Sequence, residues 1–378
     1  MEPGFVPEGD AAAVEQGVVL VHEGQVSWCG PAHRAPEHQA ARVLSRPDAT
    51  VVKGFWDLHV HGGGGCDVAD GTADALEQVC RVHAARGTVA ICPTVLASSV
   101  DDTLRALEVI GQAIGKRVGG VLVLGAHLEG PFLNPRKAGA QPTEHLREPD
   151  PVLLDELLSL GPLRIVTLAP ELPGALALVE QLVDEGVLVS MGHSDATYEQ
   201  ATAGIDAGCR MATHTFNAMR GLHHREPGLL AAALLDPRVT AEVIADGHHV
   251  AAPALKMLWR LKGAGRVALV TDCTAALDAP PGQARLGRRP VTVDDGAVRL
   301  DDGTLAGSAL TMDRAVVNMA RLAGLSLAEA VAAARATPAD LLGYACPGRG
   351  LTSGTRADDL VLLNDQGMCG KVTGGSVA

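Results

Sequence analysis

Aromatic side chains are scarce, with Phe, Trp and Tyr together making up 2% of the 378 residues. Proteins that bind single-stranded nucleic acid usually stack the bases on such rings. Positive charge is also in short supply: 31 Lys and Arg residues face 44 Asp and Glu residues, which gives a formal net charge of −13. An acidic surface repels nucleic acid and anionic membranes. We therefore expect neither as a partner.

Long apolar runs and paired cysteines are missing as well. No uncharged run is long enough to span a bilayer, and residues 1–10 lack the basic and apolar parts of a signal peptide. The eight cysteines are scattered and form no CxxC pair. In a chain of this size they indicate reduced, mostly buried residues and no disulfide framework. We expect a cytoplasmic protein with no membrane partner.

Short apolar runs alternate with amphipathic stretches along most of the chain. The stretches at residues 74–87 and 101–115 have apolar positions three and four apart, as expected for helices. The pattern predicts a (β/α)8 TIM-type barrel of the α/β class. A doubly wound open sheet is the alternative, but no GxGxxG turn follows the first strand. The expected strands lie within residues 54–62, 87–95, 121–130, 163–171, 186–195, 209–219, 239–249 and 267–276.

The two ends of the chain differ from the middle. Residues 17–29, 287–305 and 359–363 resemble short strands, and the pairs Glu23-Gly24 and Asp302-Gly303 mark turns between them. We predict a small flanking β-sandwich domain built from residues 1–53, part of 274–306, and 345–378. The barrel is predicted to span residues 54–344.

Polar residues of metal-ligand type follow the expected strands. In GFWDLHVHGGGG, His59 and His61 are two residues apart, so they point to the same face of a strand. The C-terminal ends of barrel strands meet at one face, so their residues form one set. That set comprises His59, His61, His127, Glu129, His193, His214, Asp246, His248, His249 and Asp272.

Imidazole and carboxylate without thiolate suit zinc, iron(II), manganese or cobalt. Two ions bridged by a carboxylate would activate water near neutral pH, and Glu129 fits that bridge. An adjacent carboxylate that is not a ligand would take the proton of the water and return it to a leaving amine, and Asp272 fits this role. Each residue also has a simpler interpretation, because a single histidine at a strand end is more often structural and Asp272 could cap a helix.

Six longer motifs resemble the N-acetylglucosamine-6-phosphate deacetylase family of the amidohydrolase superfamily, and the resemblance extends from about Gly17 to Leu363. They are GFWDLHVHGGGG, HLEGPFLNPRKAGAQ, GHSDATYEQA, THTFNAMRGLHHREPGLLAAAL, VTDCTAA and GTLAGSALTMDRAV. The match is weaker before Gly17 and from Gln366 onward. Cys273, within VTDCTAA, is not required by the family pattern, and we interpret it as a packing residue.

The resemblance implies a metal-dependent hydrolysis of the acetamide of N-acetylglucosamine 6-phosphate. It implies Asp272 as the catalytic acid and base, and one or two divalent ions, with Zn²⁺ or Fe²⁺ favoured over Mn²⁺ or Co²⁺. It also implies that Arg225 binds the sugar phosphate from the neighbouring subunit of a homodimer. The implied metal ligands are His59, His61, Glu129, His193 and His214. The implied substrate contacts are Ala140, Asn217, Ala218, Arg225, His249, Leu305, Ala306 and Gly307.

Three alternatives remain open at this point. Arg225 could form a structural ion pair with Glu226. The chain could hydrolyse another amide, such as an N-acyl amino acid or a cyclic amide, although HHREPG argues for a phosphorylated substrate. It could also be an inactive barrel that serves as a scaffold, although such proteins generally lose metal ligands and this sequence keeps all five.

Overall fold

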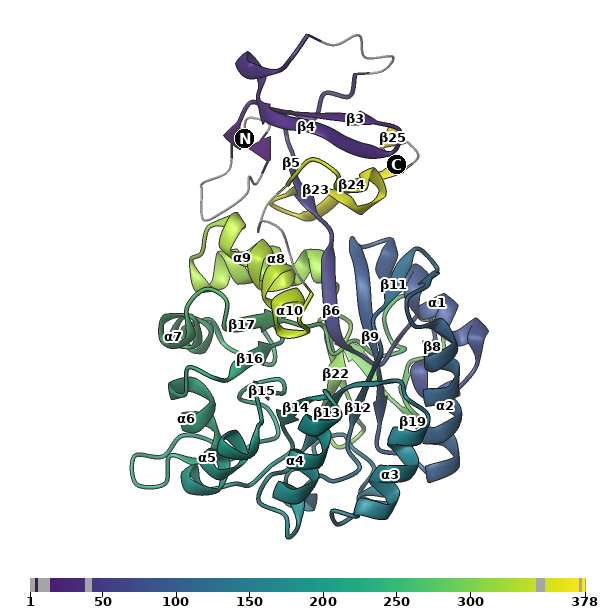
Figure 1. Ribbon diagram of the computed structural model, residues 1–378, viewed down its shortest axis with the longest axis vertical. Coiled ribbons are helices and arrows are strands. Elements are labelled where there is room, and N and C mark those ends of the chain that lie inside the picture. The colour runs from purple at the N-terminus through teal and green to yellow at the C-terminus, as the bar shows by residue number, and fades with distance from the viewer. Residues whose placement is uncertain (1–3, 6–13, 38–42, 345–350, 374–375, 378) are drawn as a thin grey trace.

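The computed structural model describes residues 4–5, 14–37, 43–344, 351–373 and 376–377 (Figure 1). The small domain predicted at the chain ends therefore includes residues that lie outside the described ones, namely 1–3, 6–13, 38–42, 345–350, 374–375 and 378.

A curled parallel sheet forms the body of the protein (Figure 1). Its neighbours pair in parallel register, as in Ile165↔Leu188 and Ala241↔Val267. Because such strands are covered on both sides, they are apolar along most of their length. The parallel strands are β6 (Phe55–Val60), β9 (Thr88–Leu96), β11 (Val121–Val123), β12 (Ala126–Glu129), β13 (Leu163–Leu168), β14 (Leu188–Met191), β15 (Met211–Ala212), β16 (Thr240–Val243) and β17 (Val267–Leu269). The short β10 (Arg117–Val118) pairs antiparallel with β11.

The first and last parallel strands meet through backbone hydrogen bonds. The backbone N–H of Asp272, just after β17, donates to the His59 carbonyl at 2.8 Å. The N–H of His61 donates to the Cys273 carbonyl at 2.7 Å, and Val60 and Cys273 form a parallel bridge. The sheet thus curls far enough to place the end of β6 beside the segment that follows β17. The predicted α/β class is confirmed, and the curled parallel sheet is consistent with the predicted TIM-type barrel.

The helices surround this sheet and follow the predicted periodicity. The stretches predicted at 74–87 and 101–115 form α1 and α2, and side chains of Thr72 and Ser99 accept hydrogen bonds from backbone N–H groups in their first turns. In the described ranges, no helix combines the length and apolar character needed to cross a membrane. The helices are α1 (Ala73–Ala84), α2 (Val100–Ala113), α3 (Pro151–Ser159), α4 (Ala175–Asp184), α5 (Tyr198–Ala207), α6 (Gly228–Leu235), α7 (Ala252–Lys262), α8 (Met312–Ala323), α9 (Leu327–Ala334) and α10 (Ala336–Leu341).

A second sheet joins the two ends of the chain at one end of the molecule (Figure 1). Its order is β2 (Val14–Glu15), β1 (Gly4–Phe5), β5 (Thr50–Lys53), β23 (Leu360–Asn364), β24 (Gly367–Thr373) and β25 (Ser376–Val377). Next to it lies a hairpin of β3 (Gly17–His22) and β4 (Gln25–Pro31), as predicted from Glu23-Gly24. Both turn residues have positive φ, of 47° and 75°, which suits a tight hairpin turn.

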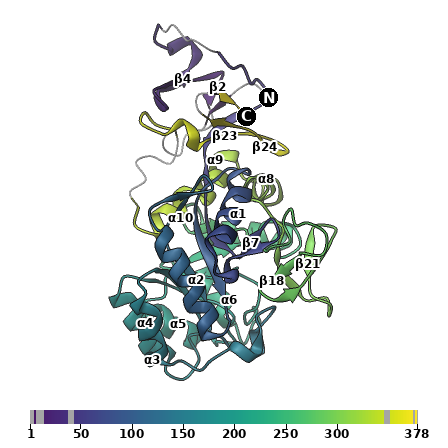
Figure 2. The same ribbon diagram turned by 90° about the vertical axis from the view of Figure 1, so that its right-hand side faces the viewer.

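Residues 285–308, which the sequence analysis grouped in part with the chain ends, lie elsewhere. They form β18 (Arg285–Leu286), β19 (Arg289–Pro290), β20 (Thr292–Asp294), β21 (Ala297–Arg299) and β22 (Leu305–Ser308). Among the described residues, these strands do not pair with the sheet of the chain ends, and Figure 2 shows β18 and β21 beside the body. Their apolar residues, such as Leu286 and Val298, pack with Leu96 at the end of β9. This segment therefore packs near the C-terminal ends of the parallel strands.

Candidate metal centre

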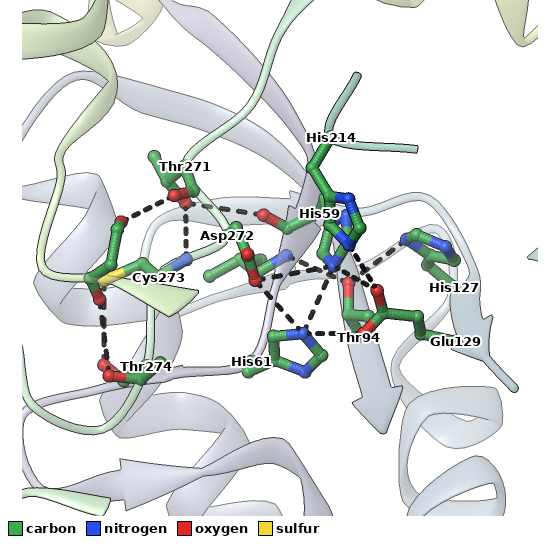
Figure 3. Close-up of polar contacts among 12 residues, drawn as sticks. His59, His61, Thr94, His127, Glu129, His214, Thr271, Asp272, Cys273 and Thr274 are labelled. Carbon is green, nitrogen blue, oxygen red and sulfur yellow. Dashed lines mark hydrogen bonds and ion pairs between the residues drawn. The ribbon is translucent and has the colours of Figure 1, made fainter. Parts of the chain in front are cut away.

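Six of the predicted site residues meet at the C-terminal ends of the parallel strands, as the barrel pattern requires. His59 lies in β6 and His61 directly after it, Glu129 ends β12, and the others follow β14, β15 and β17. All six are buried, although Asp272 keeps 8% of its surface exposed. Figure 3 shows most of this cluster, whose members are His59, His61, Glu129, His193, His214 and Asp272.

Glu129 lies at the centre of the cluster. Its Oε1 is 3.0 Å from Nε2 of His193 and 3.1 Å from Nε2 of His214. Its Oε2 is 3.2 Å from Nε2 of His61, while Oε1 is 3.6 Å from Nε2 of His59. Gln141 donates a hydrogen bond of 2.6 Å to Oε2 and so fixes the carboxylate. One carboxylate thus faces four imidazole nitrogens.

The atoms around Oε1 of Glu129 have the spacing of ligands to one ion. The Nε2 atoms of His193 and His214 are 3.1 Å apart, about as far from each other as each is from Oε1. Ligand nitrogen and oxygen atoms lie about 2.0–2.2 Å from zinc, so an ion can lie within that distance of all three. Nδ1 of His193 lies 2.8 Å from the Lys137 carbonyl, which orients the ring as metal-bound histidines require.

A second group, made of His59, His61 and Glu129, also has its ligand atoms close together. The two Nε2 atoms are 3.2 Å apart. Because both groups contain Glu129, the residues fit two ions that share this carboxylate. The donors are imidazole and carboxylate, which suits Zn²⁺, Fe²⁺, Mn²⁺ or Co²⁺ and does not select among them.

Asp272 stands next to the second group. Its Oδ1 is 3.3 Å from Nε2 of His61 and 3.6 Å from Nε2 of His59. Burial opposes ionisation of this carboxyl group, but the charge of His59 and the hydrogen bond from His61 lower its pKa to about 2. It is therefore a carboxylate at neutral pH. A carboxylate beside the candidate ion can accept a proton from water.

Three of the site residues have a backbone conformation that side chains other than glycine rarely adopt. The φ angles are 46° for His193, 29° for His214 and 49° for Asp272. Left-handed conformations of this kind cost free energy and are common at functional sites. Here they occur just after β14, β15 and β17, at the points where the three side chains enter the cluster.

Glu242 is a fully buried carboxylate within β16 that was not among the residues predicted from the sequence. Its Oε2 is 3.3 Å from Nδ1 of His59 and accepts a hydrogen bond of 3.2 Å from the backbone N–H of His214. It therefore touches one histidine from each candidate ion group. The signal was a glutamate inside the apolar run VTAEVIAD, where a buried strand otherwise has no charged residue.

Asp57 is a second buried carboxylate that the sequence analysis did not identify. It accepts hydrogen bonds from Oγ1 of Thr271 at 2.6 Å and from the backbone N–H of Thr271 at 3.2 Å. Burial raises its pKa to about 7 in spite of these bonds. Asp57 thus ties β6 to the residue before Asp272.

Two other histidines of the predicted set have partners outside the cluster. His127 on β12 places Nε2 2.8 Å from Oγ1 of Thr167 and Nδ1 3.1 Å from the Leu58 carbonyl. Burial and the nearby charge of His59 lower the pKa of His127 well below its usual value, so a neutral, structural imidazole explains it. His249 places Nδ1 2.6 Å from Oδ2 of Asp246, which fixes the orientation of the ring.

The predicted substrate contacts are distributed around the cluster. Asn217 donates a hydrogen bond of 3.1 Å to the His214 carbonyl. Ala218 accepts one of 3.1 Å from the N–H of Ser194, next to His193. Gly307 has φ of 57°, and a Cβ at this position would lie 2.7 Å from the Asp272 carbonyl, so only glycine fits there.

The other predicted contacts lie beside these residues or away from the cluster. Leu305 and Ala306 precede Gly307 in β22, and the Ala140 carbonyl accepts a hydrogen bond of 3.0 Å from Arg289. Arg225 is exposed, and its guanidinium contacts His224 at 2.8 Å. Among the described residues, no ion pair joins Arg225 to Glu226, and the Arg225 guanidinium makes no hydrogen bond or ion pair with the cluster.

Cys273 is fully buried beside Asp272. Burial and the charge of Asp57 raise the pKa of its thiol well above the usual value. Its Sγ lies 3.6 Å from the Thr274 carbonyl. A neutral thiol in this position packs against its neighbours, in agreement with the interpretation from the sequence.

Comparison with known proteins adds an independent observation. Residues 50–365 match the Amidohydrolase family. The chain is similar to N-acetylgalactosamine-6-phosphate deacetylase of Escherichia coli O157:H7, with 39% identity over 85% of both chains. It is also similar to N-acetylglucosamine-6-phosphate deacetylase of Vibrio furnissii, with 38% identity over 87% of this chain and 82% of the other.

A solved structure resembles nearly the whole chain. It is a mutant of N-acetyl-D-glucosamine-6-phosphate deacetylase from Mycobacterium smegmatis in complex with N-acetyl-D-glucosamine-6-phosphate. The TM-score is 0.89 and the identity 36%, over 99% of this chain and 98% of the other.

Proposed function

This chain belongs to the N-acetylglucosamine-6-phosphate deacetylases of the amidohydrolase family, and we propose that it hydrolyses the acetamide of N-acetylglucosamine 6-phosphate to glucosamine 6-phosphate and acetate. The observation that carries the proposal is the arrangement of Glu129 among four imidazole Nε2 atoms, with Asp272 beside them. A hydrolase of an unactivated amide needs such a site, because water has to be made a nucleophile and the leaving amine has to be protonated.

We assign His193, His214 and Glu129 to one divalent ion and His59, His61 and Glu129 to a second. When bound, the metal lowers the pKa of water and polarises the acetyl carbonyl. Asp272 accepts the proton of the attacking water and returns it to the sugar nitrogen when the C–N bond breaks, so the products are acetate and the free amine. His249, held by Asp246, stabilises the developing oxyanion.

The remaining assignments concern substrate binding and assembly. We assign Ala140, Asn217, Ala218 and the segment 305–307 to contacts with the sugar, and Arg225 to the phosphate. Arg225 is exposed and its guanidinium contacts His224, not a residue of the cluster, so we assign it to the site of a neighbouring subunit in a homodimer. We propose a cytoplasmic enzyme of amino-sugar catabolism and cell-wall recycling, with a closed (β/α)8 barrel and a flanking β-sandwich.

Acetate release tests the proposed function. We expect protein treated with a chelator to be inactive, and Zn²⁺, Fe²⁺, Mn²⁺ or Co²⁺ to restore turnover of N-acetylglucosamine 6-phosphate. The galactosamine epimer should be assayed in parallel, because a relative of 39% identity is named for it. Folded, metal-loaded protein that releases acetate from neither phosphorylated sugar would contradict the proposal, and N-acyl amino acids would be assayed next.

Replacement of Arg225 by Ala separates recognition of the phosphate from the chemistry. We expect kcat/KM for N-acetylglucosamine 6-phosphate to fall by about tenfold to a hundredfold, which is the loss of a charge-assisted hydrogen bond of roughly 1.5–3 kcal/mol. Turnover of unphosphorylated N-acetylglucosamine should not change. Arg260→Ala, which removes an exposed arginine on α7, is the matched control. An equal loss on both sugars would remove Arg225 from phosphate binding.

Glu242→Gln tests whether this carboxylate orients the metal ligands. The amide keeps the size of the side chain but carries no charge. The hydrogen bond that residue 242 accepts from the Nδ1–H of His59 is therefore weaker. Loss of such a partner typically reduces metal affinity by about 10–100-fold. We expect this loss in a competitive titration with a chromogenic chelator, and we expect the ion at His59 and His61 to leave first. Glu185→Gln, on the surface after α4, should bind metal like wild type, and equal affinities for all three proteins would contradict the role.

A further inference from the structure

We propose that the protein has a second anion site, specific for a phosphate group. It lies at the N-terminal ends of the parallel strands, whereas the metal centre lies at their C-terminal ends. A cavity of about 340 Å³ opens there between the N-terminal ends of β14 to β17 and helix α10. Figure 1 shows α10 near β17, which it contacts. Leu188 and Thr240 begin β14 and β16, and Arg210 and Arg266 directly precede β15 and β17. The metal-site residues follow the opposite ends of these strands, so the two sites are distinct.

Arginine dominates the polar wall of the cavity. Arg238 is neutralised, because its Nη2 is 2.7 Å from Asp236 and its Nη1 is 2.9 Å from Asp206. Arg210 uses Nη1 for two backbone carbonyls and makes no ion pair with any described residue. The guanidinium of Arg266 is exposed and makes neither a hydrogen bond nor an ion pair in the described part of the chain.

The balance of charge in the cavity favours an anion. One carboxylate, that of Asp340, also lines the wall and is exposed. The same cavity is lined by two guanidinium groups, those of Arg210 and Arg266, for which the described residues provide no carboxylate partner. The cavity therefore carries a local surplus of positive charge in a protein whose formal net charge is −13. Guanidinium groups bind phosphate through paired N–H donors, which explains their presence here.

Thr240 provides an independent observation. It is 1% exposed and forms part of the wall, yet its Oγ1 has no hydrogen-bond partner among the described residues. A buried hydroxyl without a partner costs free energy. Because Oγ1 is closed off from solvent in the structure, a rotation of the Thr240 side chain toward a ligand oxygen in the cavity would remove this cost. The volume is within the range of small-molecule sites, so a phosphorylated metabolite fits as well as free phosphate.

Isothermal titration of inorganic phosphate tests the proposal. The full chain should carry Arg225→Ala to weaken phosphate binding at the metal centre, and the comparison with Arg266→Ala then separates the cavity from that centre. We expect this protein to bind phosphate, and Arg266→Ala to weaken the binding by roughly tenfold or more, as for the loss of one charge-assisted hydrogen bond. Arg260→Ala in the same background, which removes an exposed charge outside the cavity, should not change it. Absence of phosphate binding, or equal effects of the two substitutions, would overturn the proposal.

Two further measurements identify the source of the phosphate group and control for folding. Tighter binding of glucose 6-phosphate than of phosphate supports a phosphorylated metabolite, and equal binding supports free phosphate. Glucose alone should not bind, and equal binding of glucose and its phosphate would contradict the site. Thr240→Val keeps the shape of the side chain, so we expect an unchanged Tm without phosphate and a smaller rise in Tm with phosphate. A wild-type rise in Tm in this variant would rule out Thr240 as a phosphate contact.

Discussion

Asp272→Asn is expected to lower kcat for N-acetylglucosamine 6-phosphate by about 100-fold to 10,000-fold, the range for loss of a general acid and base. Asparagine has the shape of aspartate and tolerates the left-handed φ of 49° at this position, so the backbone should not move. It cannot accept the proton of the water or return it to the leaving amine. Acetate release under saturating substrate measures the effect, and metal content after dialysis should equal that of the wild type.

A carboxylate outside the cluster provides the control for Asp272→Asn. Asp278 is exposed, pairs with Arg86 at 3.1 Å, and also has a positive φ of 51°. We expect Asp278→Asn to retain wild-type kcat. If Asp272→Asn kept its turnover, another residue would have to move the proton. If it lost its metal, Asp272 would be a ligand and the two functions would have to be separated by other means.

Glu129→Gln is expected to have the largest effect of all, because this single carboxylate belongs to both candidate ion groups. The amide supplies no negative charge to offset two divalent ions, and both groups lose a ligand at once. We expect metal content to fall for both ions. Turnover should fall on the order of a thousandfold or more, since the metal contributes several kcal/mol to the stabilisation of the transition state.

Metal content and thermal stability measure this effect without relying on activity. A metal that binds only the folded protein raises its Tm, so Zn²⁺ should stabilise the wild type and leave Glu129→Gln unchanged. Glu108→Gln, an exposed residue on α2, should respond like the wild type. If Glu129→Gln lost one ion and kept the other, Glu129 would be a ligand of a single ion. The prediction that both ions share its carboxylate would then be wrong.

Much of the fold followed from local patterns in the sequence. The two-residue spacing of His59 and His61 indicated a shared strand face, and the structure places both side chains in one cluster. The rule that parallel strands end at one face brought together Glu129, His193 and Asp272, which are far apart in the chain. The family indicated by the motifs is confirmed by the comparisons, whereas the roles of the individual site residues stay predictions.

The features that the sequence did not indicate depend on contacts between distant residues. Glu242 and Asp57 each sit in an apolar strand, and nothing in the local pattern says that they face His59 or Thr271. The left-handed backbone at His193 and His214 is equally hidden, because histidine adopts positive φ more often than most residues but still only in a small minority of positions. The strands of residues 285–308 have the same local pattern as those at the chain ends, so the sequence analysis grouped part of that segment with them. Their place depends on the apolar contact with Leu96.

The sheet that joins the chain ends has a consequence for biosynthesis. Strand β5 pairs with β23, as in Val52↔Val361, so one edge of β5 stays open until the last part of the chain leaves the ribosome. An apolar strand with an open edge readily pairs with other chains. The nascent protein therefore passes through a long interval in which this edge is unprotected, even after the curled sheet has formed. A protein truncated before Leu360 would lack β23, so the edge of β5 would stay unpaired. We expect such a protein to aggregate in the cell.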